Sequence, residues 1–411
     1  MKRIIHLTSV FVLFSMLVAI VCSSANAQDV SVPSQAASAT LLYVKPGAGG
    51  GCTSWVDACE LQAALAAASS GSEIWVQAGV YKPTVGADRT ISFALKSGVA
   101  LYGGFTGSEN ERAQRDWATN ITTLSGDIGV VDDISDNSYH VVSGSGVDAT
   151  AVLDGFTVTG GNANGGTTND YGGGMYINAS SPTIANIIAK NNSAAYGGGM
   201  FNTISSPTLT NVTFSANQAG SRGGGMYSYQ SNFTLEKITF SGNTTGDSGG
   251  GIYLNACNLT LINVSFTGNS AAMHGGGMLI HASGMALTNG IFSGNSAATG
   301  SAVYNYQSSP LLSNVTFSGN LAVTGGAMYN NLSSPILENL ILWGNTPNQI
   351  QNNAGSTPAI SYSDIQGGCP AGATCTQVIS LDPQFIRSPS PGADSTWGTA
   401  DDDYGDLHLQ L

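Results

Sequence analysis

The residues best suited to chemistry gather ahead of the repeated part of the chain, in the acidic segment SGDIGVVDDISDN. Its aspartates are Asp127, Asp132, Asp133 and Asp136. Carboxylate oxygens at this density are ligands that Ca²⁺ prefers, but the spacing lacks the glycine and the final glutamate of an EF-hand loop. The segment therefore predicts either a calcium site or a solvated acidic loop.

A second acidic cluster lies near the end of the chain, in TADDDYGDL, and contains Asp401, Asp402, Asp403 and Asp406. The same two interpretations apply, because the carboxylates are again dense and again lack the spacing of a known loop. Calcium is thus the only cofactor that the sequence suggests.

Two histidines are the remaining candidates for metal binding, since imidazole is a common ligand of transition metals. His274 and His281 stand seven residues apart within one repeat, and no carboxylate or cysteine is close to them in the sequence. Two imidazoles without a third ligand support a metal site less well than a structural role.

The N-terminus has the pattern of an export signal. Lys2 and Arg3 precede an apolar run over residues 4–21, which is followed by a small-x-small cleavage pattern ending at Ala27. A membrane anchor fits less well because the run is short, and a lipoprotein attached at Cys22 lacks the small residue expected before it. The pattern predicts a secreted or surface-attached protein, with no transmembrane span after cleavage.

Four cysteines form two close pairs in the sequence, Cys52 with Cys59 and Cys369 with Cys375. In an oxidising compartment they could form two disulfides, which would stabilise the fold by restricting the unfolded chain. Cys257 is left over inside the repeats, where we expect it to be a small buried apolar residue.

The composition restricts the possible partners. Charged residues make up only 9% of the 411 residues, against about 25% in ordinary domains. Only twelve lysines and arginines are present and the net charge is −13. Nucleic acid is therefore excluded as an expected partner, because phosphate binding requires clustered basic side chains, and acidic sugars would be repelled at long range.

Glycine-rich turns recur at a step of 25 or 26 residues. They begin at positions 172, 197, 223, 249, 275, 300 and 325. Asparagines keep the same step at positions 192, 217, 243, 269, 295, 320 and 345, and a second series stands at 186, 211, 263, 289, 314 and 339. A fixed period in this range indicates a solenoid, and glycine turns with alternating runs such as LTNVTF favour strands over helices.

We therefore predict an all-β right-handed parallel β-helix in which each repeat forms one coil. Equivalent residues would then stack about 4.8 Å apart. The predicted core rows are Phe214, Phe240, Phe266, Phe292 and Phe317, with Met200, Met226, Met278 and Met328 beside them. The asparagines fit turns in which stacked amides bond from coil to coil. The shortage of charge follows, because a repeated charge would face its own copy.

A short helix is expected at the start of the solenoid. Residues 57–69 place Leu61, Ala64, Leu65 and Ala68 on one face, which suits a cap over the open end of the core. The predicted divisions are a signal peptide at 1–27, an N-terminal strand and cap at 28–70, the β-helix at 71–365 with regular repeats at 172–350, and an acidic tail at 366–411.

The motifs FSAN, FSGN and FTGN, each followed by GGGM or GGAM, resemble the repeats of the chlamydial polymorphic outer membrane proteins. The wider layout, from LLYVKPGAGGGCTSW to the closing DDDYGDLHLQ, is similar to bacterial secreted β-helix proteins with a pectate lyase-like fold. In that group LHLQ is typically followed by a further anchoring stretch, so we expect a C-terminus that is shortened relative to those proteins.

The leading functional hypothesis is a non-catalytic exported or cell-surface β-helix that serves as an adhesin, a scaffold or a glycan-contacting module. It rests on the repeats, where no two carboxylates recur at one coil position, although acid–base catalysis needs converging groups. The expected partner is an extracellular glycan or a neighbouring cell surface. A row of Thr213, Thr239, Ser265 and Thr316 could also bind an ordered surface, but Ile291 interrupts it.

The alternative is an enzyme, either a polysaccharide lyase or a glycoside hydrolase. The resemblance implies this option, because lyases of the pectate lyase-like fold combine Ca²⁺ with a basic side chain in a groove on the wall of the helix. In this chain such a site would require Arg112 or Arg115 close to Asp127 and to Asp132 or Asp133. Fold alone does not decide between the two hypotheses.

Overall fold

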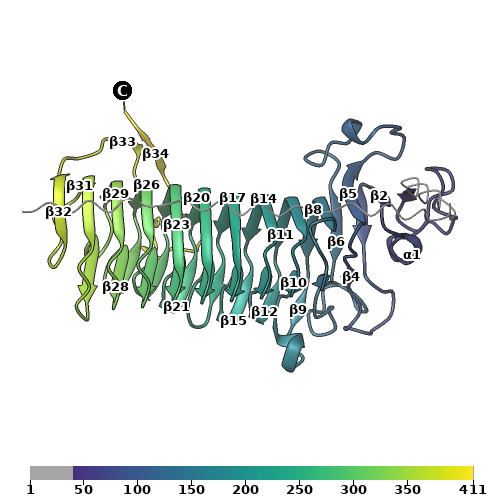
Figure 1. Cartoon of the computed structure of the whole chain (residues 1–411), viewed down its shortest axis with the longest axis horizontal. Coiled ribbons are helices and arrows are strands. Elements are labelled where there is room, and N and C mark those ends of the chain that lie inside the picture. Colours follow the sequence, from purple (N-terminus) through teal and green to yellow (C-terminus); the bar gives the residue numbers. More distant parts are fainter. Residues whose placement is uncertain (1–39, 411) are drawn as a thin grey trace, which may run out of the picture. The chain divides into compact units, whose positions relative to one another are not determined.

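Parallel strands, stacked one coil upon the next, are the main structural element of residues 40–410, which the computed structural model describes (Figure 1). The predicted signal peptide lies outside the described residues. Each regular coil contributes one strand to each of three sheets, which we call A, B and C. The predicted parallel β-helix with one repeat per coil is confirmed, whereas its right-handed sense stays a prediction.

Sheet A contains the longest strands. Its members are β1 (Leu41–Val44), β2 (Glu73–Gln77), β3 (Gly79–Tyr81), β5 (Ala100–Phe105), β6 (Thr122–Ser125), β8 (Val152–Thr159), β11 (Thr183–Lys190), β14 (Thr208–Ser215), β17 (Asn232–Ser241), β20 (Asn258–Thr267), β23 (Gly284–Ser293), β26 (Leu311–Ser318), β29 (Ile336–Trp343), β31 (Ala359–Ile365) and β32 (Thr374–Ile379). The parallel pairing of β32 with β31 extends the solenoid beyond the boundary expected at residue 365.

Sheets B and C consist of short strands on either side of the glycine turns. Sheet B contains β4 (Phe93–Ala94), β7 (Val142–Ser145), β10 (Met175–Asn178), β13 (Met200–Thr203), β16 (Met226–Tyr229), β19 (Ile252–Asn255), β22 (Met278–His281), β25 (Val303–Tyr306), β28 (Met328–Asn331) and β30 (Ile350–Asn353). Sheet C contains β9 (Asn162–Ala163), β12 (Ser193–Tyr196), β15 (Gln218–Arg222), β18 (Thr244–Thr245), β21 (Ser270–His274), β24 (Ser296–Thr299) and β27 (Leu321–Thr324).

Stacked phenylalanines fill the core between the sheets, as predicted. The rings of Phe240 and Phe266 are nearly parallel with centroids 4.9 Å apart, and Phe266 and Phe292 are 4.6 Å apart. All five phenylalanines of the row are fully buried. Met200 pairs in register with Met226, which places the methionine row beside them. Coil register thus converts a sequence period into continuous apolar columns.

Buried asparagines of the first series hold each turn to the next. The backbone N–H and the side-chain Nδ2 of Asn217 both donate to Oδ1 of Asn243, at 3.1 and 3.0 Å. Nδ2 of Asn243 in turn donates to the carbonyl oxygen of Phe214. Asn243 is fully buried, so the ladder satisfies polar groups that would otherwise lack partners.

The second asparagine series does not lie in turns. Asn263 and Asn289 occupy the middle of β20 and β23, where their backbones adopt positive φ of 57° and 59°. Asparagine tolerates this left-handed conformation better than most residues. The series therefore marks a kink inside sheet A rather than the expected turn. Its exposed amides bond from coil to coil, as Nδ2 of Asn289 does by donating to Oδ1 of Asn263 at 3.1 Å.

The glycine turn combines two requirements. Gly223 has φ of +68°, a left-handed conformation that suits glycine. Gly224 follows it, and a Cβ atom there would lie 2.4 Å from the carbonyl oxygen of Thr244 in the next coil. Close approach of successive backbones and positive φ together explain the repeated tripeptide.

Non-repetitive segments flank the solenoid, and one of them covers its N-terminal end. The helix α1 (Leu61–Ala67) buries Leu61, Ala64 and Leu65 at the N-terminal end of the core. Two 3-10 turns, η1 (Arg112–Gln114) and η2 (Thr167–Asp170), lie in loops. After β32, an antiparallel pair of β33 (Phe385–Arg387) and β34 (Asp406–Leu409) returns over the outside of the coils (Figure 1).

Two disulfides brace the chain near its ends, Cys52 with Cys59 and Cys369 with Cys375. Each closes a short loop outside the regular repeats. Cys257 is a buried free thiol, and burial raises its pKa. A buried thiol of this kind behaves as an apolar residue rather than as a nucleophile.

We predict that Asn243→Ala lowers the free energy of unfolding by roughly 2–4 kcal/mol, because it leaves several buried donors and acceptors without partners. Asn263→Gly is the matched control, because glycine keeps the positive φ and the side chain it removes is exposed. Denaturant unfolding followed by circular dichroism measures both. Equal losses in the two variants would contradict the role of the buried ladder.

Candidate functional site

An aromatic row runs along the outer face of sheet B. In each strand the residue after the core-facing position points outward and stacks in register with its equivalents. This row, called here the aromatic ladder, consists of Tyr176, Phe201, Tyr227, Tyr253, Leu279, Tyr304 and Tyr329. Ring centroids of Tyr227 and Tyr253 are 5.0 Å apart, and those of Tyr304 and Tyr329 are 5.3 Å apart. Its buried members form a cluster separate from the core.

Two flanking rows accompany the ladder. On the side of sheet C, Tyr196, Arg222, Ser248 and His274 occupy equivalent positions in successive coils. On the opposite side, the last residues of the sheet B strands form another row, in which His281 pairs in register with Tyr306. The three rows together present aromatic, imidazole and guanidinium groups on a wall that otherwise carries few charges.

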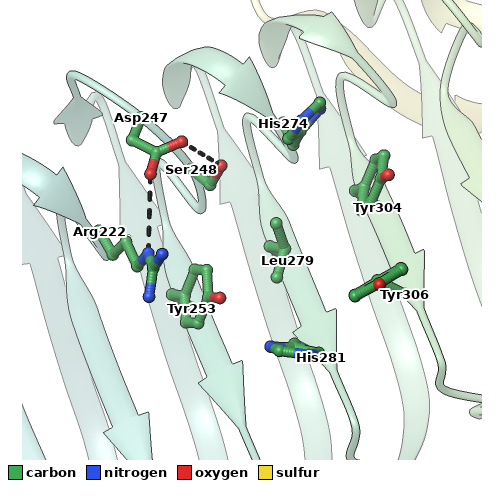
Figure 2. A pocket seen from close by; sticks show the side chains of 9 residues that line it. All are labelled: Arg222, Asp247, Ser248, Tyr253, His274, Leu279, His281, Tyr304 and Tyr306. Carbon is green, nitrogen blue, oxygen red and sulfur yellow. Dashed lines mark hydrogen bonds and ion pairs between the residues drawn. The ribbon is translucent and has the colours of Figure 1, made fainter.

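Leu279 interrupts the ladder and leaves a pocket of about 280 Å³. Figure 2 shows Leu279 between Tyr253 and Tyr304, at the centre of the side chains that line this pocket. A leucine at this rung lacks the ring that its neighbours have. At this pocket the wall therefore differs from the pattern that the other coils repeat.

An ion pair forms one side of the pocket. Nε of Arg222 lies 3.6 Å from Oδ2 of Asp247, and Oγ of Ser248 donates to Oδ1 of Asp247 at 2.8 Å (Figure 2). The guanidinium of Arg222 lies 5.1 Å from the ring centroid of Tyr253, a cation–π arrangement. Burial raises the pKa of Tyr253 to about 12, so its hydroxyl stays protonated and can donate a hydrogen bond.

Two imidazoles form the other side. His274 packs against Tyr304 with centroids 4.5 Å apart, and His281 against Tyr306 at 5.0 Å. Partial burial lowers the pKa of both histidines, although the nearby Asp247 carboxylate partly opposes this for His274. Both rings are therefore mostly uncharged at pH 7, and Nδ1 of His274 is buried without a hydrogen-bond partner among the described residues.

The residues that the enzyme hypothesis requires do not come together. Nη2 of Arg115 pairs with Oδ2 of Asp154 at 2.6 Å, and Arg112 pairs with Glu73 at 2.7 Å. The carboxylate of Asp127 is paired with Lys82 instead, at 3.3 Å. Each of the two arginines is thus engaged with a carboxylate other than Asp127.

The carboxylates of the first acidic cluster serve their own loop. Oδ1 of Asp127 accepts from the backbone N–H of Asp132, and Oδ2 of Asp136 accepts from that of Val130. The backbone N–H of Ser135 donates to Oδ1 of Asp133 at 2.9 Å. Hydrogen bonds from the side chain and the backbone of Ser135 lower the pKa of Asp133. Such bonds are typical of turns.

The second acidic cluster is arranged similarly. Asp401 and Asp402 accept hydrogen bonds within their turn, while Asp403 pairs with Arg387 and Asp406 with His408. Among residues 40–410 no three carboxylate, histidine or cysteine side chains converge as a metal site would require. The geometry therefore gives the two candidate calcium clusters no support.

Sequence reasoning missed the pocket although every residue of it was visible. His274 and Asp247 are 27 residues apart in the sequence, but one coil apart in the structure. The signal was the repeat period itself: the residue after each core methionine is usually aromatic. The step of 25 or 26 residues relates these tyrosines to one another as it relates the core phenylalanines, so the period alone is enough to predict the ladder.

A protein-family model matches a short part of the repeated region. The model of the Chlamydia polymorphic membrane protein repeat matches residues 237–255, which confirms the resemblance of the repeat. No curated protein sequence matches the chain significantly. In the part of the chain that is described, no helix has both the length and the apolar character needed to cross a membrane.

Solved structures similar to the chain are β-helix proteins at low identity. Tailspike protein 2 of Escherichia coli O157:H7 bacteriophage CAB120 matches with 12% identity and a TM-score of 0.48, over 85% of this chain and 48% of the tailspike. Pectate lyase Pel9A matches with 12% identity and a TM-score of 0.45, over 91% and 90%. Polygalacturonase from Erwinia carotovora ssp. carotovora matches with 13% identity and a TM-score of 0.38, over 93% and 99%. The chain thus spans about half the length of the tailspike.

We predict that the melting temperature falls as the pH drops from 7 to 5, in part because of His140. Its ring is buried against Tyr176, and burial lowers its pKa below the ordinary 6.5. As the pH falls, the unfolded chain therefore binds a proton at this histidine before the folded chain does. The contribution of neutral His140 to the free energy of unfolding is fully present above pH 6.5 and is lost as the pH falls toward the lower pKa of the folded state. His140→Phe should reduce this slope, whereas His408→Asn, at an exposed side chain, should not. Equal slopes in all three proteins would contradict the assignment.

Proposed function

We propose that the chain is a non-catalytic exported or cell-surface β-helix protein that contacts extracellular polysaccharide through the outer face of sheet B. The aromatic ladder is the observation that carries the proposal. A pyranose ring has an apolar face of C–H groups that packs on an aromatic ring, while its hydroxyls bond to polar groups at the sides. A surface that repeats from coil to coil suits a polymer that repeats from unit to unit.

The direction in which the ladder faces supports this proposal. A structural role would be met by rings in the core, and the phenylalanine row already fills that place. Five of the seven ladder residues are only 5–8% exposed and form an apolar cluster outside the core. The partly buried tyrosines packed against this cluster, among them Tyr229, Tyr306 and Tyr329, offer the ring edges and hydroxyl tips that a partner can reach. Aromatic groups of this kind are enriched where proteins bind partners.

The lack of converging catalytic groups supports the non-catalytic part of the proposal. Glycoside hydrolysis commonly uses two carboxyl groups that flank the bond, and Asp247 is the one carboxylate lining the pocket at Leu279. Arg115 and Asp127, the pair expected for a lyase, are each bound to other side chains. Contact with a glycan as an adhesin or a scaffold therefore fits better than turnover.

We predict that purified residues 28–411 are retained by at least one neutral polysaccharide among cellulose, mannan and galactan. Phe201→Ala and Tyr227→Ala should each weaken retention about tenfold, or roughly 1.4 kcal/mol of binding free energy, since each removes a ring on which the partly buried tyrosines of this face pack. Thr213→Ala, on the outer face of sheet A, is the matched control and should bind as the unmodified protein does. Affinity electrophoresis in gels that contain each polymer measures the change.

Two results would count against the proposal. Equal retention of the ladder variants and the control would remove sheet B from the contact. Release of new chain ends from a polysaccharide in the presence of Ca²⁺, abolished by Arg115→Ala or Asp127→Ala, would instead establish an enzyme with its active site in the early coils.

A further inference from the structure

We propose that the gap in the aromatic ladder at Leu279 is a socket for a single uncharged pyranose residue of the bound polysaccharide. This inference rests on the proposed glycan-contacting function and assigns one position on the wall a selective role. The rest of the ladder would supply sequence-tolerant contact area, whereas the socket would recognise one sugar unit.

The shape of the gap sets the size of the occupant. Tyr253 and Tyr304 stand on the rungs before and after Leu279, so the missing ring leaves a space bounded by aromatic groups on both sides. The volume of about 280 Å³ lies just below the range for drug-sized ligands, roughly 300–1,000 Å³, and suits one ring. The floor is the side chain of Leu279, which offers an apolar surface to the C–H face of a sugar.

The rim supplies the polar groups that hydroxyls require. Asp247 offers carboxylate oxygens as acceptors, and the guanidinium of Arg222 holds N–H donors beside them (Figure 2). Vicinal hydroxyls can donate to the first and accept from the second. The imidazoles of His274 and His281 and the hydroxyl of Tyr253 complete the rim with groups that exchange hydrogen bonds without carrying charge.

Charge selects an uncharged sugar over an acidic one. Arg222 and Asp247 neutralise each other inside the socket, so no net positive charge is left to hold a carboxylate. Lys237 is the next basic residue in the chain after Arg222, but it lies on sheet A beside Glu236. The net charge of −13 repels uronates at long range as well.

Filling the gap is the sharpest test. Leu279→Tyr restores the ring that neighbouring rungs have, so the variant should fold as the parent does while the socket is closed. Asp247→Asn removes the charged acceptor without changing the shape. Thr213→Ala is the control, because it alters an outward-facing residue of sheet A, away from the socket and the ladder. Thermal unfolding checks that all three variants are folded.

The measurement is saturation-transfer NMR with methyl glucoside, methyl galactoside, methyl mannoside and methyl galacturonate as probes, followed by calorimetric titration of the probe that binds best. We expect a neutral glycoside to bind, with at least a tenfold loss of affinity in Leu279→Tyr and Asp247→Asn and less than a twofold change in Thr213→Ala. Tighter binding of the galacturonate, no binding of a neutral glycoside, or undiminished binding by Leu279→Tyr would each overturn the socket.

Failure of the socket can be distinguished from failure of the proposed function. If polysaccharide retention depends on Phe201 and Tyr227 but Leu279→Tyr binds the glycosides unchanged, the proposed contact face is supported and the socket is contradicted. If no polysaccharide is retained but a neutral glycoside binds and Leu279→Tyr abolishes that binding, the socket is supported and the proposed contact with a polymer is contradicted.

Discussion

Register between successive coils is the constraint on which the whole structure depends. Every residue in the regular repeats meets its counterpart from the next coil, so each position is chosen for how well it stacks on itself. Buried asparagine amides satisfy this requirement by bonding along the row, as Asn217 does to Asn243. Phenylalanine rings satisfy it by lying parallel at 4.6–5.1 Å. Repeated charges would fail it, which explains why so few occur.

The same constraint produces the candidate binding face. A row of outward-facing rings along sheet B follows from one aromatic position per repeat, and together with the two flanking rows it makes a continuous wall. A wall built this way is uniform until a repeat departs from the pattern. Leu279, Arg222, Asp247 and His274 are such departures, and they meet at one pocket. In this fold, a site that differs from the rest of the wall arises where a repeat departs from the pattern.

The repeat period predicted the coil length, the phenylalanine and methionine columns and the asparagine ladder, because those positions recur and stack on their own copies. The position of Asp247 beside Arg222 could not be read in the same way, since it depends on single departures that have no period. The density of the acidic clusters suggested metal ligands, and the calcium sites stay a prediction. In the structure, Asp133 and Asp401 accept hydrogen bonds from backbone N–H groups of their own loops. These local hydrogen bonds occupy carboxylate oxygens that a metal ion would otherwise bind.

The most direct measurement of the central claim is hydroxyl-radical footprinting of residues 28–411 with and without a retained neutral polysaccharide, read out by mass spectrometry. Contact through sheet B predicts reduced oxidation of Tyr229, Tyr306 and Tyr329 and unchanged oxidation of Tyr362, an exposed tyrosine on sheet A. Protection of Tyr362 without protection of the sheet B tyrosines would contradict the account.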